Sequence, residues 1–153
     1  MSKNIREAPL SDKTCTILLV EDNHDHIELI RRAITIGPLK ADIYISTDGE
    51  DALNFVFKTG KYKKAKRVPT PDLILLDIKL PKVDGYNVLQ SIRAHTAYRS
   101  IPIIILTTSA REEDIERMLQ YGADSYIIKP SQYHEFVAIY EKIENYWKQH
   151  IAT

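Results

Sequence analysis

Short, uninterrupted runs of apolar residues recur along the chain and constrain its fold more than any other feature. The clearest runs are Thr16–Val20, Leu73–Leu76, Ile103–Leu106 and Tyr126–Ile128. Runs of this length that are rich in Ile, Leu and Val are typical of strands buried on both faces of a parallel sheet. A further run, Asp42–Ser46, is flanked by polar residues and is therefore expected at an edge of the sheet.

Segments with helical periodicity separate these runs. In each segment, apolar residues recur at steps of three and four, which places them on one face of a helix. The expected helices cover residues 24–36, 52–56, 88–92, 115–119 and 132–150. Strand and helix alternate five times, which is the signature of right-handed βαβ units and predicts an α/β protein with a doubly wound parallel sheet.

Length and patterning predict one folded domain. At 153 residues the chain has the size of a single domain with one substantial core. Residues 1–13 mix charge, Pro and Ser without periodicity, so they are predicted to form a flexible tail before a domain that spans residues 14–153. Residues 58–67 are rich in Lys and Arg. A patch for nucleic acid or a protein partner is one interpretation of this segment, but Tyr62 is its only aromatic residue and a solvated loop is favoured.

Composition limits the compartment and the partners. Lys plus Arg and Asp plus Glu both number 21, so no net charge favours nucleic acid or a membrane surface. Cys15 is the only cysteine, which excludes an internal disulfide and fits a reducing compartment. The apolar runs are too short to span a membrane, and the first residues lack the apolar core of a signal peptide. We expect a cytoplasmic protein.

Chemically active side chains follow four of the expected strands. In chain order they are Glu21 and Asp22, then Asp77, then Thr107, and then Lys129. In open α/β sheets, ligands bind beyond the carboxyl ends of the strands, where the strand order reverses. Three clustered carboxylates repel one another, and a hard divalent cation such as Mg²⁺ relieves that repulsion. One carboxylate can then act as a nucleophile toward a phosphoryl group that a lysine and a hydroxyl hold in place.

Five fragments together resemble the receiver domain of bacterial response regulators. In chain order they are Ile17–Asp22, Leu75–Pro81, Asp84–Gly85, Leu106–Thr107 and Lys129–Pro130. The resemblance covers residues 16 to about 148. It implies a flavodoxin-like sheet of five parallel strands in the order 2-1-3-4-5 with five helices. It also implies a single-domain response regulator of a two-component phosphorelay, without an effector domain, that accepts a phosphoryl group from a histidine kinase.

The resemblance assigns the metal and the acceptor to particular residues. Asp77 is expected to be the phosphoacceptor, and Asp22 and Asp77 the main Mg²⁺ ligands. Glu21 is expected to act mostly through a metal-bound water. The main-chain carbonyl of Lys79 is expected to supply a further ligand.

The resemblance also assigns the groups that hold and sense the phosphoryl group. Thr107 is expected to donate a hydrogen bond to it, and Lys129 to pair with it, with a cis peptide between Lys129 and Pro130. Tyr126 stands at the position of the family's switch aromatic residue. It is expected to rotate inward as Thr107 moves toward the phosphate.

Further features resemble a narrower group, the stand-alone regulators that serve cyanobacterial phytochromes. They are the basic segment followed by Pro69–Asp72, the run Thr107–Ser109 and a long aromatic last helix. A phytochrome-type kinase is therefore an expected partner, and the output is expected to pass to a downstream protein or a phosphotransfer protein. Lys79 and Ser109, at positions where the family tunes hydrolysis, are neither acids nor amides, so we expect a long-lived phosphoryl group.

Aromatic and apolar residues recur at steps of three and four along the last helix. Part of this stripe is expected to be the helix's core face. Because the stripe is wide and aromatic, it also predicts a homodimer through this helix and the neighbouring fourth helix and fifth strand. The candidate contact residues are Tyr133, Tyr140 and Trp147.

Two other functions deserve comparison with a signalling switch. A Mg²⁺-dependent phosphohydrolase would share the aspartyl-phosphate chemistry, but such enzymes place Asp-x-Asp after the first strand, where this chain has Glu21-Asp22-Asn23 and no cap insertion. A zinc site at His24 and His26 is disfavoured, because residues two apart on a helix do not face the same way. We therefore expect a phosphoacceptor that catalyses its own phosphorylation and dephosphorylation, not an enzyme with an external substrate.

Overall fold

The computed structural model describes residues 14–65, 67–130, 135 and 137–150. Strands and helices alternate along the chain, with one short 3₁₀ helix, η1, before the third strand. The strands are β1 Cys15–Val20, β2 Ala41–Ser46, β3 Leu73–Asp77, β4 Ile103–Thr107 and β5 Ser125–Ile128. The helices are α1 His24–Thr35, α2 Gly49–Phe57, η1 Gly60–Tyr62, α3 Gly85–Ala94, α4 Glu112–Gln120 and α5 Val137–His150.

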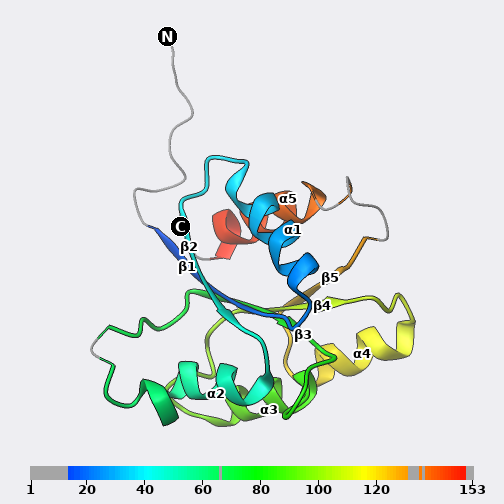
Figure 1. Ribbon diagram of the computed structural model, residues 1–153. Coiled ribbons are helices and arrows are strands. Elements are labelled where there is room, and N and C mark those ends of the chain that lie inside the picture. The colour runs from blue at the N-terminus through cyan, green and yellow to red at the C-terminus, as the bar shows by residue number, and fades with distance from the viewer. Residues whose placement is uncertain (1–13, 66, 131–134, 136, 151–153) are drawn as a thin grey trace.

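All five strands are parallel and form one sheet in the order β2-β1-β3-β4-β5. Helices α1 and α5 cover one face of the sheet, and α2, α3 and α4 cover the other (Figure 1). This arrangement confirms the predicted doubly wound, flavodoxin-like fold. It also confirms the prediction that Asp42–Ser46 lies at an edge, because β2 pairs only with β1.

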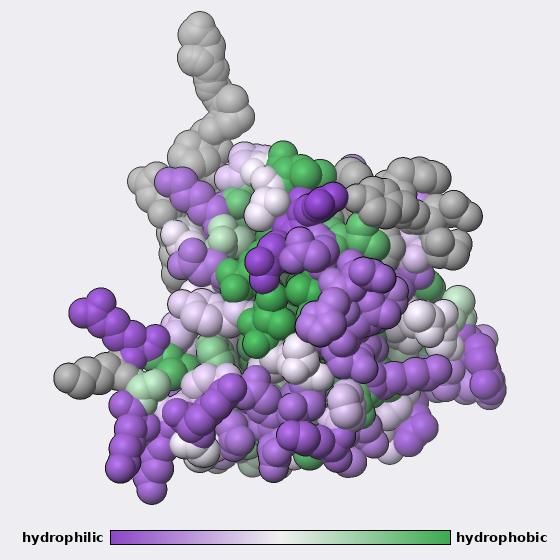
Figure 2. Space-filling model, in the orientation of Figure 1, coloured by the Kyte–Doolittle hydropathy of each residue, from purple (hydrophilic) through white to green (hydrophobic). Residues whose placement is uncertain are grey.

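Alternate residues of the central strands enter two separate cores. Ile17 and Leu19 of β1 pack with the helices α1 and α5, whereas Leu18 and Val20 pack with α2, α3 and α4. A strand that is buried on both faces must be apolar at every position, which explains the continuous runs in the sequence. At the β2 edge the sheet is only partly covered, and Figure 2 shows apolar side chains gathered between the two hydrophilic helical layers.

Helix α2 begins three residues earlier than the apolar pattern alone indicates. Asp48 caps it, because its side chain accepts a hydrogen bond of 2.7 Å from the backbone N–H of Asp51. The described residues of the basic segment after α2 lie in the predicted loop, with η1 inside it. Lys61 in this loop lies 3.3 Å from Asp51 and is largely exposed. No helix in the described parts of the chain is long and apolar enough to cross a membrane.

The last helix corrects one prediction. Trp147 is completely buried, and Tyr140 is 6% exposed. The hydroxyl of Tyr140 accepts a hydrogen bond from the backbone N–H of Leu39 at 3.0 Å and donates one to Glu144 at 2.9 Å. The prediction that Tyr140 and Trp147 contact a second subunit is therefore wrong, because both side chains fill the core between α5 and the rest of the domain. Tyr133 lies outside the described residues.

Candidate functional site

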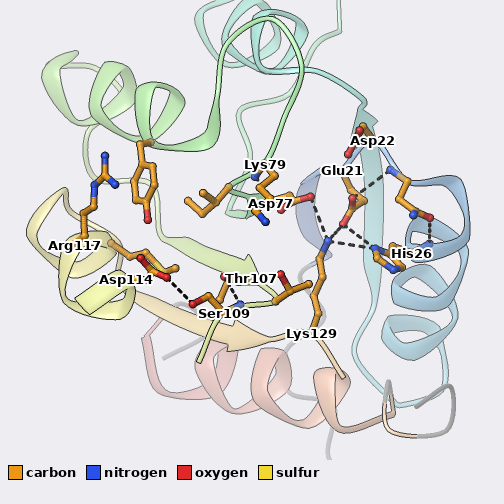
Figure 3. Close-up of a pocket in the computed structure, with 15 residues that line it drawn as sticks. Glu21, Asp22, His26, Asp77, Lys79, Thr107, Ser109, Asp114, Arg117 and Lys129 are labelled. Carbon is orange, nitrogen blue, oxygen red and sulfur yellow. Dashed lines mark hydrogen bonds and ion pairs between the residues drawn. The ribbon is translucent and has the colours of Figure 1, made fainter. Parts of the chain in front are cut away.

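A cavity of about 440 Å³ opens at the carboxyl end of the sheet. The register of the strands creates it: Val20 pairs with Leu76, so Glu21 and Asp77 leave two neighbouring strands side by side. The residues that the sequence placed at this rim all line the cavity (Figure 3). They are Glu21, Asp22, Asp77, Lys79, Thr107 and Lys129.

Three carboxylates meet in the cavity. Glu21, Asp22 and Asp77 each present an oxygen within 4.8 Å of the others. Glu21 is 1% exposed and Asp77 is 7% exposed, whereas Asp22 is exposed to solvent. A donor set of carboxylate oxygens that is open to water on one side fits a hard divalent cation, which keeps several of its waters. The three carboxylates predicted to hold a metal ion therefore lie together in the fold, and the metal site itself stays a prediction.

Lys129 joins the two buried carboxylates. Its Nζ lies 2.5 Å from Oε1 of Glu21 and 3.2 Å from Oδ2 of Asp77, and its side chain is 5% exposed. The backbone N–H of Lys129 donates a 2.6 Å hydrogen bond to the carbonyl of Thr107, which fixes the start of the side chain. One buried ammonium thus faces two buried carboxylates, so the cluster carries a net negative charge when both acids are ionised.

Burial and the neighbouring charges affect the ionisation of Glu21. Its pKa is raised from 4.5 to about 7, first because burial disfavours the charged form. The hydrogen bond to Lys129 opposes this rise, and the negative charge of Asp77 adds to it. Because the pKa of Glu21 lies near neutral pH, this carboxyl is only partly ionised there, and a cation placed among the carboxylates would favour release of its proton.

Thr107 and Ser109 form the opposite wall of the cavity. The hydroxyl oxygen of Thr107 accepts a 3.0 Å hydrogen bond from the backbone N–H of Ser109. The Ser109 hydroxyl in turn donates a 2.6 Å hydrogen bond to Oδ2 of Asp114 on α4. Asp114 is a cavity residue that the sequence reasoning missed. The Ser109 hydroxyl proton is thus engaged by Asp114.

Three further residues in the cavity were not predicted. Arg117 of α4 lies over the ring of Tyr86 at the start of α3, with its guanidinium carbon 4.3 Å from the ring centre. His26 of α1 approaches from the other side, with Nδ1 3.3 Å from Nζ of Lys129. The pKa of His26 is lowered, first by burial and then by the charge of Lys129. The one sequence signal for His26 was its place four residues after Asp22, in the first turn of α1.

Two predictions near β5 have different outcomes. The predicted cis peptide between Lys129 and Pro130 is wrong, because this bond is trans, as is every peptide bond between described residues. Trans is the lower-energy isomer of an X–Pro bond by about 0.5–1 kcal/mol, and Lys129 reaches both buried carboxylates from the trans backbone. Tyr126 is partly buried, packs against the core beneath α2, α3 and α4, and does not line the cavity. Its switching role stays a prediction.

Comparison with known proteins shows which proteins are similar to this chain in sequence. The family model of the response regulator receiver domain matches residues 17–141. Response regulator Rcp1 of Synechocystis is 31% identical over 136 residues, which cover 89% of this chain and 90% of Rcp1. The probable methanogenesis regulatory protein FilR2 of Methanothrix harundinacea is 37% identical over 131 residues, which cover 86% of this chain and 82% of FilR2.

Solved structures extend this similarity to the fold. The phosphorylated cyanobacterial phytochrome response regulator RcpA superimposes with a TM-score of 0.81 at 34% identity, over 90% of this chain and 96% of RcpA. The Mn²⁺-bound form of Rcp1 superimposes with a TM-score of 0.80 at 31% identity, again over 90% of this chain and 96% of the other.

The raised pKa of Glu21 predicts how stability changes with pH. A carboxyl whose pKa is higher in the folded protein binds its proton more tightly when folded, so its stabilising contribution is lost as the pH rises through the folded pKa. Without added metal, we expect the Glu21 contribution to the free energy of unfolding to fall as the pH rises from 4.5 to about 7. Urea denaturation at a series of pH values measures it. The Glu21→Gln variant should lack this slope, and an unchanged slope in that variant would contradict the assignment.

Proposed function

The chain belongs to the response regulator receiver family, and from that premise we propose that Asp77 is the residue that accepts a phosphoryl group from a histidine kinase. Receiver domains are the phosphoacceptors of two-component systems and are not classed as enzymes. The observation that carries the choice of Asp77 is the convergence of Glu21, Asp22, Thr107 and Lys129 around it in one cavity. The neighbouring acid Asp84 has a different role, because it caps α3 by accepting a 2.9 Å hydrogen bond from the backbone N–H of Asn87.

The carboxylates define where the proposed Mg²⁺ ion would be held. Asp22 and Asp77 are its proposed direct ligands, Glu21 a ligand through water, and the main-chain carbonyl of Lys79 a further ligand. When bound, the ion would offset the negative charge of the carboxylates and of the incoming phosphoryl group. The mutual proximity of the three carboxylates supports this assignment.

The chain's own residues account for the rest of the proposed transfer. A carboxylate oxygen of Asp77 forms the new bond to phosphorus as the bond from phosphorus to the kinase's imidazole nitrogen breaks. The ammonium of Lys129, 3.2 Å from Asp77 before transfer, pairs with a phosphoryl oxygen afterwards, and the Thr107 hydroxyl donates to another. The movement of Thr107 is the proposed signal to which Tyr126 responds, through the strand pair β4–β5.

The partners and the location follow from the family. We propose a phytochrome-type histidine kinase as the phosphodonor, because RcpA is a cyanobacterial phytochrome response regulator. The proposed output is a downstream protein or a phosphotransfer protein that meets the receiver in the cytoplasm. The elements of the receiver fold lie between Cys15 and His150, and the predicted flexible tail of residues 1–13 lies outside the described residues.

Replacement of the acceptor tests the central proposal. We predict that Asp77→Asn abolishes transfer of label from a phosphorylated histidine kinase, because an amide is not a nucleophile toward phosphorus. Asp84→Asn is the matched control, since Asn caps a helix as well as Asp does, and it should be labelled like the parent protein. Full labelling of Asp77→Asn would refute the assignment. Rapid turnover of small phosphate esters would instead support the phosphohydrolase alternative.

We further predict that the phosphorylated protein loses its label over hours. Lys79 and Ser109 offer no acid or amide to orient a water, and the Ser109 hydroxyl proton is held by Asp114. The decay of label, followed after removal of the kinase, measures this lifetime. Ser109→Glu should shorten it, because a carboxylate can orient the attacking water. Decay of the parent protein within minutes would show that another group in the cavity performs this task.

We also propose a homodimer, through the face formed by α4 and β5. Two apolar side chains on these elements are exposed, Leu119 at 46% and Ile128 at 39%. Burial of such side chains is a common source of affinity between subunits. Light scattering should show a dimer whose population rises on phosphorylation, and Leu119→Glu should shift it to monomer. Ile36→Glu is the control, an equally drastic change at an exposed site at the end of α1, which lies on the opposite face of the sheet from α4. A monomer in both states would refute the proposal.

A further inference from the structure

Lys129 has a third partner in the cavity, His26, which the receiver pattern does not mention. Its Nζ lies 3.3 Å from Nδ1 of His26, besides 2.5 Å from Glu21 and 3.2 Å from Asp77. An ammonium has three donors and no acceptor, so Nδ1 of His26 must accept. The imidazole is therefore neutral and carries its proton on Nε2. Figure 3 shows the ammonium of Lys129 reaching between the two acids, with His26 beside it.

Of the three partners of Lys129, His26 is the one with no proposed role in holding the metal ion or accepting the phosphoryl group. Glu21 and Asp77 belong to the carboxylate group that can hold a cation, and Asp77 is the proposed acceptor. During the reaction, a cation and the phosphoryl group would therefore compete with Lys129 for these two carboxylates. His26 lies outside that carboxylate group and has no charge to be neutralised. It is the acceptor that can keep its hydrogen bond to Lys129 before and after transfer.

The backbone holds His26 in place for this contact. His26 lies in the first turn of α1, and its backbone N–H donates a 3.0 Å hydrogen bond to the side chain of the N-cap residue Asn23. The backbone N–H of Asn23 itself donates to Oε2 of Glu21 at 3.2 Å. The side chain of His26 is 32% exposed and lies 3.8 Å from Oε1 of Glu21. A short chain of hydrogen bonds thus ties the start of α1 to the buried acid.

We propose that His26 is a positioning residue for phosphoryl binding, which accepts a hydrogen bond from Lys129 and holds the ammonium at the place where a phosphoryl oxygen binds. This inference rests on the proposed function of Asp77 and extends the site to a residue on α1. His26 does not touch the phosphoryl group. Its effect passes through Lys129, so loss of its acceptor should free the ammonium and weaken binding of the phosphoryl group.

The experiment uses three variants and two measurements. The first measurement is the affinity for beryllofluoride, a phosphoryl mimic, in the presence of Mg²⁺ by fluorine NMR. The second is the rate at which an amine-reactive reagent modifies Lys129 in the metal-free protein, by mass spectrometry. His26→Ala removes the acceptor, and His26→Asn keeps an oxygen near the position of Nδ1. His24→Ala removes an exposed histidine of the same helix turn and is the control.

We expect His26→Ala to bind beryllofluoride roughly tenfold more weakly, the effect of losing one hydrogen bond to a charged group. Lys129 should become more reactive in the same variant. His26→Asn should restore both values, and His24→Ala should match the parent protein. A purely structural role for His26 would change the melting temperature without changing the reactivity of Lys129.

Two results would overturn the proposal. One is parent-like affinity and Lys129 reactivity in His26→Ala, and the other is a defect in His26→Asn as large as that in His26→Ala. Failure of the parent protein to accept a phosphoryl group on Asp77 would count against the proposed function instead. The reactivity of Lys129 in metal-free protein does not depend on that outcome, so it tests the contact with His26 by itself.

Discussion

The buried ammonium of Lys129 is the interaction on which the functional end of this fold depends. Two carboxylates, Glu21 and Asp77, are removed from water at the ends of adjacent strands, and neither could remain ionised there without a nearby positive charge. Lys129 supplies that charge but balances only one of them. Burial, and then the negative charge of Asp77, raises the pKa of Glu21, and the unbalanced carboxylate charge makes the cavity attractive to a cation. This incomplete balance of charge is the property of the cavity that suits it to the proposed metal ion and phosphoryl group.

The sheet determines which side chains can take part. Parallel strands place all their carboxyl ends at one edge, and the order β2-β1-β3-β4-β5 puts β1 next to β3. Glu21 and Asp77, far apart in the sequence, become neighbours for that reason. Lys129 comes from β5, two strands away from β3, and only a long side chain can bridge that distance. A lysine suits this position because its flexible stem carries the charge across Thr107 at the end of β4.

Several features of the site could not be found from the sequence, and each has the same physical origin. His26 and Asp114 lie on helices, and a helical residue enters the cavity only if the helix packs on the sheet with the right rotation and height. On the last helix, the sequence identified an apolar face but not the surface that this face packs against. Its periodicity identified one apolar face, but it could not tell whether Tyr140 and Trp147 covered this domain's own core or another subunit. Packing against α1 and the hydrogen bond to Leu39 decided in favour of the core.

The sequence by itself determined the strands, the helices and the acids, hydroxyl and lysine at the strand ends. Those features are local: a two-sided strand must be uniformly apolar, and a polar residue that follows it must lie at the sheet's edge. Only the tertiary structure decided how those groups interact. The 2.5 Å contact of Lys129 with Glu21 and the approach of His26 to Lys129 both join elements that are distant along the chain. Such contacts depend on helix orientation and side-chain reach, which no local pattern encodes.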